Sequence, residues 1–169
     1  MITAVTGSFN ISVIASGAKL CVFALLLGLG QMIVVTSGDG AIDLSQKYIL
    51  TLTAYVSCTV MDKNVLLGLV AAIIVGALCG FISSCVNVFL KVPAMITTLA
   101  TGYLFYTVIL VVSSKWSSIP AKGFVKFVNK NLIGINMMTI VCIVVAVILW
   151  FLLYRTKYGH QLHAVGQKT

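Results

Sequence analysis

Apolar residues occur along the chain in long blocks whose lengths predict helices that cross a membrane. About 20 apolar residues, at a rise of 1.5 Å each, span the hydrocarbon core of a bilayer. No block shows the polar and apolar alternation of a strand. The expected spans cover residues 20–36, 44–60, 65–90, 94–112 and 137–154, and residues 11–18 either extend the first span or lie in the interface. The pattern predicts an all-α integral membrane protein with about five transmembrane helices, and four or six also fit it.

Composition supports the membrane class. Hydrophobic residues make up 60% of the chain, charged residues only 8%, and the mean hydropathy is +1.14. A soluble domain carries about a quarter charged residues, because its surface faces water. The formal charge of +8 therefore predicts flanks that contact anionic membrane lipid or an acidic partner. Nucleic-acid binding is excluded because no soluble domain is present to perform it.

A polar stretch, GDGAIDLSQK, separates the first two blocks at residues 38–47. It is an ordinary loop, a helix break at membrane depth, or a re-entrant turn that lines a cavity. Irregular backbone at that depth persists only where protein or water satisfies its polar groups. The spacing of Asp43 and Gln46 predicts an N-cap with a capping box, and Lys47 is placed to pair with Asp43. We expect a helix break between Gly38 and Asp43.

Polar side chains in or beside the apolar blocks are the candidates for a solute pathway, because they would be costly against lipid. Amides, hydroxyls and a carboxylate suit a solute with many hydroxyl groups. The alternative for each is a hydrogen bond to a neighbouring helix. The candidates are Gln31, Asp39, Asp43, Ser45, Asn87 and Thr97.

Two further patterns concern packing and the membrane surface. Gly76 and Gly80 form a G-x-x-x-G pair, which predicts the close approach of another helix. Lys122, Lys126 and Lys130 recur every four residues in the polar stretch 113–136. That spacing predicts either a short basic helix in the interface or a solvated loop.

Catalytic and metal sites are not predicted. The chain contains no recognisable set of nucleophile, base and orienting residue, and no phosphate-binding glycine-rich loop with a lysine. His160 and His163 are three residues apart, but the tail around them offers no carboxylate or cysteine as a further zinc ligand. We expect no enzyme activity, no metal and no cofactor.

Three motifs, in order along the chain, resemble those of bacterial sugar ABC-transporter permeases. GQMIVVTSGDGAIDLS at 30–45 resembles the family signature G-Q-x-x-V-x-x-x-G-G-I-D-L-S. VNVFLKVPAMITTLAT at 86–101 resembles N-G-x-x-V-x-x-x-x-I-P-x-F-I-x-T-L-x-T, and YRTKYGHQLHAVGQ at 154–167 resembles R-T-x-F-G-R-x-x-x-A-I-G-G-N. The family is the ribose, xylose, arabinose and galactoside type, related to the autoinducer-2 permeases. Together the motifs cover nearly the whole chain.

The resemblance implies a passage for a monosaccharide in a multi-pass protein of the bacterial cell membrane. It also implies three protein partners: a separate ABC ATPase, an extracytoplasmic solute-binding protein and a second permease subunit, identical or different. Residues 1–169 are expected to form a single transmembrane region, half of an ABC importer permease fold, without the first family span and the C-terminal half. The chain is then a fragment or a truncated gene product.

The resemblance also gives the chain an orientation. It places the loop at 113–136 outside and the tail in the cytoplasm, leading toward a helix that docks on the ATPase. The residues expected on the ATPase side are Arg155, Thr156, Tyr158, Gly159 and His160.

Four positions depart from the family pattern. Gln46 and Lys47 stand where the family has Val-Gly, Val88 replaces a glycine, and His160 replaces an arginine. Two other functions remain open. One is a secondary transporter, in which a discontinuous helix couples ions to solute, and the other is an inactive truncated fragment.

Overall fold

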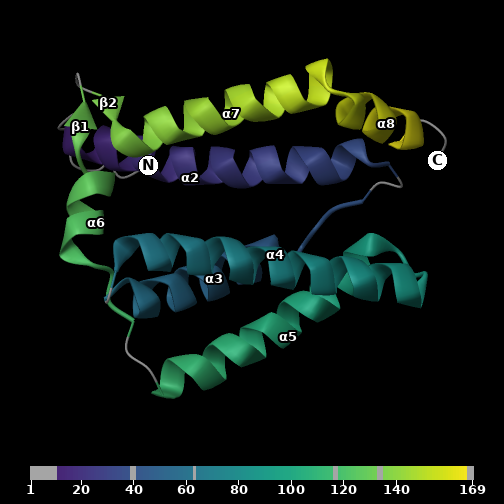
Figure 1. Ribbon diagram of the computed structural model, residues 1–169, viewed down its shortest axis with the longest axis horizontal. Coiled ribbons are helices and arrows are strands. Elements are labelled where there is room, and N and C mark those ends of the chain that lie inside the picture. The colour runs from purple at the N-terminus through teal and green to yellow at the C-terminus, as the bar shows by residue number, and fades with distance from the viewer. Residues whose placement is uncertain (1–10, 39–40, 63, 116–117, 133–134, 167–169) are drawn as a thin grey trace, which may run out of the picture.

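The computed structural model of the chain describes residues 11–38, 41–62, 64–115, 118–132 and 135–166, and these are almost entirely helical (Figure 1). A pair of two-residue strands, β1 (Asn131–Leu132) and β2 (Ile135–Asn136), forms a small antiparallel hairpin. The all-α prediction is confirmed. The helices are α2 (Ile11–Thr36), α3 (Gln46–Met61), α4 (Val65–Leu90), α5 (Ala94–Lys115), α6 (Lys122–Val128), α7 (Met137–Arg155) and α8 (Lys157–Gly166).

The helices form two layers (Figure 1). In one layer α2 packs against α7, and α8 continues beyond the end of α7 and lies near the C-terminal end of α2 (Figure 1). In the other layer α3, α4 and α5 pack together around a small core of Leu52, Cys79, Phe105 and Ile109. The short helix α6 connects the layers at one end of the molecule, and the segment of residues 41–45 leads into the second layer from the other end (Figure 1).

Three helices of the described residues are long and apolar enough to span a membrane: α4, α5 up to Ser114, and α7. Residues 21–36 of α2 form a shorter apolar helix, and α3 has 16 residues. All five occupy the predicted blocks, and α2 begins at Ile11, so residues 11–18 are continuous with the first helix. Their outer faces carry large exposed side chains such as Ile73 (72%) and Phe81 (68%). Such exposed apolar side chains suit hydrocarbon surroundings, where their exposure costs nothing.

Local signals explain where the helices begin and end. The Asn64 side chain accepts a 2.9 Å hydrogen bond from the Leu66 amide and caps α4. At the other end of α4, Lys91 adopts a left-handed conformation with φ of 51°. Pro93 follows two residues later, and because it lacks an N–H and disfavours helix before it, the next helix starts at Ala94. Asn136 caps α7 in the same way by accepting from Met138 N.

Candidate functional site

The segment between α2 and α3 runs back along α2 instead of leaving the bundle. The Gln31 side-chain amide is assigned the orientation in which its oxygen and its nitrogen both have partners. In that orientation its oxygen accepts from Asp43 N at 2.9 Å and its nitrogen donates to Asp43 O at 3.3 Å. Three residues further, Gln46 Nε2 donates to Leu27 O at 2.9 Å. Thr36 and Leu27 are nine residues apart, or about 14 Å along a helix. Residues 41–45 therefore run back along α2 before α3 begins, and we call them the re-entrant segment. The predicted break between Gly38 and Asp43 is confirmed.

Side chains satisfy the backbone polar groups of this irregular segment. The Thr98 hydroxyl of α5 accepts from Leu44 N at 3.1 Å and lies 3.2 Å from Ile42 O, to which it donates. The Asp43 carboxylate accepts from Ser45 N at 2.8 Å and from Ser45 Oγ at 2.6 Å. These bonds, with the two from Gln31 to the Asp43 backbone, supply the hydrogen-bond partners that a non-helical backbone needs where water is scarce.

The predicted capping box is wrong. Ser45 occupies the N-cap position of α3, without a capping bond from its own side chain. The amide of Gln46 turns toward α2 because Gly30 leaves it space: a Cβ at position 30 would lie 2.7 Å from Gln46 Nε2. Lys47 places its Nζ 4.8 Å from the centroid of the Tyr48 ring, and it forms no ion pair with Asp43 in the described structure.

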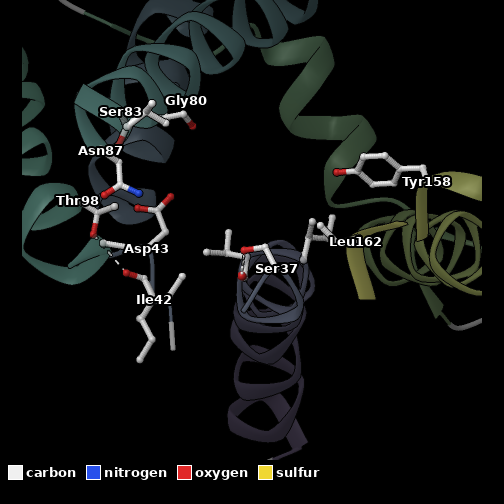
Figure 2. A pocket seen from close by; sticks show the side chains of 15 residues that line it. Ser37, Ile42, Asp43, Gly80, Ser83, Asn87, Thr98, Tyr158 and Leu162 are labelled. Atoms are coloured by element: carbon white, nitrogen blue, oxygen red, sulfur yellow. Dashed lines mark hydrogen bonds between the residues drawn. The ribbon is translucent and has the colours of Figure 1, made fainter. Parts of the chain in front are cut away.

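A cavity of about 420 Å³ opens beside the re-entrant segment, between the two layers. Asp43 and Asn87 lie on the same side of it, and Tyr158 and Leu162 of α8 lie across from them (Figure 2). Asn87 Oδ1 is buried and has no hydrogen-bond partner within the described residues. The polar side chains of the lining are Ser37, Asp43, Ser83, Ser84, Asn87, Thr98 and Tyr158.

A second cavity, of about 640 Å³, adjoins the first, and the two share five lining residues: Ser37, Ala41, Asn87, Val88 and Ala94. It reaches Lys91 and Pro93, at the turn between α4 and α5. The two cavities lie between the layers at the same end of the molecule, and hydroxyl, amide and carboxylate groups are part of their lining.

The predicted pathway residues divide between the lining and the packing behind it. Asp43 and Asn87 line the cavity. Gln31 does not line the cavity but forms hydrogen bonds with the backbone of Asp43. Ser45 (0% exposed) and Thr97 (1% exposed) are enclosed by protein. Asp39 lies outside the described residues.

Sequence reasoning missed several lining residues. On α4, Gly80, Ser83, Ser84 and Asn87 have the spacing i, i+3, i+4 and i+7, so they share a helical face. That small polar stripe was visible in the sequence. Thr98 gave no comparable signal, because its partners on the re-entrant segment are 54 and 56 residues away.

The two glycines of the G-x-x-x-G pair have different surroundings. A Cβ at Gly76 would lie 3.4 Å from Thr53 Cγ2, so this glycine faces α3. At Gly80 a Cβ would meet no atom within 4 Å, and the residue lines the cavity.

The tail forms α8 after a tight turn at Thr156. The Thr156 hydroxyl donates to Leu152 O and lies 3.5 Å from Gly159 N, while His160 Nδ1 donates to Thr156 O at 2.9 Å. Gly159 is buried against the backbone of Leu153, where a Cβ has no room. Arg155, Tyr158 and His160 are all exposed, and the Tyr158 ring also points toward the cavity (Figure 2).

Metal binding has no support in the described part of the chain, where no group of three or more His, Cys, Asp or Glu residues is placed to hold an ion. The chemistry available at the cavity is hydrogen bonding. Its acceptors are a carboxylate, an amide oxygen and several hydroxyls, and its donors are the hydroxyls and one amide.

Comparisons with a family profile and with curated proteins both point to transport-system permeases. The profile of the family described as "Branched-chain amino acid transport system / permease component" matches residues 4–169. The chain is 32% identical over 146 residues to the D-allose transport system permease protein AlsC of Escherichia coli K12, an alignment that covers 84% of this chain and 44% of AlsC. It is 25% identical over 167 residues to the autoinducer 2 import system permease protein LsrD of Escherichia coli K12, covering 94% of this chain and 49% of LsrD. The chain thus spans about half the length of these curated relatives, and no solved structure matches it.

Proposed function

This chain belongs to the family of branched-chain amino acid transport system permease components, and on that premise we propose that it forms part of the passage of an ABC importer for a monosaccharide-like solute. The observation that carries the proposal is the cavity beside the re-entrant segment, where several polar side chains stand among apolar ones in the lining. Relatives named for D-allose and autoinducer 2 transport support a solute rich in hydroxyl groups.

The cavity suits weak, multiple contacts with such a solute. Asn87 presents an unpartnered buried acceptor, and Asp43 adds a carboxylate on the same side. A hydrogen bond that replaces one to water contributes only about 1 kcal/mol net. Contacts of that strength let a solute pass without being trapped. The choice of which sugar is transported is then made by the solute-binding protein.

Three protein partners complete the proposed system. A solute-binding protein delivers the sugar from outside the cytoplasm, and a second permease subunit closes the other side of the passage. ATP hydrolysis comes from a separate ATPase on the side of α8, because this chain carries no phosphate-binding loop of its own. Residues 1–169 supply about half of a permease in this arrangement, and the chain acts as a passage and not as an enzyme.

Uptake by reconstituted vesicles tests the proposal. A permease that contains residues 1–169 is incorporated with its ATPase, its binding protein and a second permease subunit, and entry of labelled D-allose and other monosaccharides is measured. We expect entry that requires internal ATP and the binding protein. Entry that continues with a hydrolysis-defective ATPase but stops with a protonophore would indicate a secondary transporter instead. The absence of ATP-driven entry for every monosaccharide tried would contradict the proposal.

A further inference from the structure

The end of the molecule opposite the polar cavity carries a short amphipathic helix, α6 (Figure 1). Lys122 and Lys126 are four residues apart and exposed, so they share one face of this helix. Phe124 and Phe127 lie on the other side and face the first turns of α4. The helix thus has a cationic edge and an apolar edge, as interfacial helices do.

An apolar slot of about 310 Å³ separates α6 from α4. In the described structure it is lined by apolar residues alone: Val65, Leu69, Gly123, Phe124 and Phe127. Val65 and Leu69 remain 37% and 42% exposed, and a Cβ at Gly123 would meet no atom within 4 Å. The protein therefore leaves this slot unfilled where α4 begins at the membrane surface.

Charge at this end is mostly positive. Lys122, Lys126 and Lys130 are all exposed. Asp62, at the C-cap of α3, is the one described carboxylate at this end. A ligand that contacts both the apolar slot and the lysines therefore combines a hydrocarbon chain with an anionic group.

We propose that the slot binds an acyl chain of an anionic phospholipid whose phosphate lies at Lys122 and Lys126. In a membrane protein, lipid is the hydrocarbon present at a surface where α4 already exposes apolar side chains. Lysine side chains at an interface extend toward phosphate while their methylene groups stay on apolar surface. An acidic soluble protein would pair with the lysines but would leave the apolar slot open.

Lipid retention by the purified chain of residues 1–169 tests this site. The chain is delipidated in detergent, offered phosphatidylglycerol and phosphatidylcholine with identical acyl chains, and examined by native mass spectrometry. We expect a preference for phosphatidylglycerol on the order of tenfold, because two lysines near a lipid phosphate each contribute. The double variant K122Q/K126Q loses this preference, whereas the matched variant K91Q/K157Q, at the other end, keeps it.

A second variant separates the slot from the charge. Gly123→Leu fills the slot without changing any charge, so we expect it to reduce retention of both lipids. Equal retention of the two lipids by the unaltered chain, or unchanged retention by Gly123→Leu, overturns the proposal. Binding of a poly-aspartate peptide that depends on the two lysines, together with no phosphatidylglycerol preference, would assign them to an acidic protein partner instead.

Discussion

The side chain of Gln46 and the backbone carbonyl of Leu27 are joined by a 2.9 Å hydrogen bond that ties the start of α3 to the middle of α2. The bond exists because position 30 is glycine and leaves the amide a path to α2. One turn further along α2, Gln31 holds the backbone of Asp43. The two glutamines fix the depth of the re-entrant segment and, with it, the position of the Asp43 carboxylate at the cavity.

Gly30→Ala should lower the stability of the chain. In an ordinary helix interior the same change would raise stability, because glycine there is less favourable than alanine by roughly 0.5–1 kcal/mol. The new Cβ would lie 2.7 Å from Gln46 Nε2 and displace that amide. Thermal unfolding in detergent measures the effect. Gly28→Ala is the matched control, because a Cβ there meets no atom within 4 Å.

Gln46→Val should make Gly30→Ala less harmful. The shorter apolar side chain removes both the crowding and the bond to Leu27, so the two substitutions should not be additive. We expect a coupling of about 0.5–3 kcal/mol in a double-mutant cycle. Additive effects would show that Gly30 and Gln46 do not contact one another.

Thr98→Val should destabilise the re-entrant segment by about 1–3 kcal/mol, because it leaves Ile42 O and Leu44 N without their partner at nearly unchanged side-chain volume. The matched control is Thr107→Val on the same helix, where the hydroxyl is exposed and donates only to Tyr103 O. Unfolding midpoints of the two variants decide the matter. Equal midpoints would mean that Thr98 does not support the segment.

Asp43→Asn should reduce solute uptake more than Asp62→Asn does. Asparagine keeps an oxygen that accepts from Ser45, so the local structure persists while the charge at the cavity is lost. Asp62 is exposed at the end of α3, away from the cavity lining. Uptake in the reconstituted system compares them. Wild-type rates from both variants would leave Asp43 with a structural role alone.

Gly159→Val should detach α8 from α7, since the backbone of Leu153 occupies the space that a side chain needs. Trypsin cleavage after Arg155 and Lys157 should become faster by at least severalfold, because a displaced helix opens more readily. Ala164→Val is the control, because this residue is exposed on the same helix. Equal cleavage of the two variants would contradict the tight packing of Gly159.

The sequence by itself determined the membrane class and the positions of the helices. A block of apolar residues long enough to cross a bilayer has few alternatives to a helix, because every backbone polar group must be satisfied within it. The bounds of α4 agree with the predicted block, and the Asn64 cap and Pro93 are local signals that any reader of the sequence can find. The break between Gly38 and Asp43 was equally local.

The direction taken by the chain after that break was decided by the tertiary structure alone. Gln31, Gln46 and Thr98 are three polar residues among many, and hydrophobic periodicity does not say which backbone groups they bind. Their partners lie 12 to 56 residues away. Only when α2, α3 and α5 are packed together do these side chains meet the re-entrant backbone, and the same packing places Asp43, Asn87 and Tyr158 around one cavity.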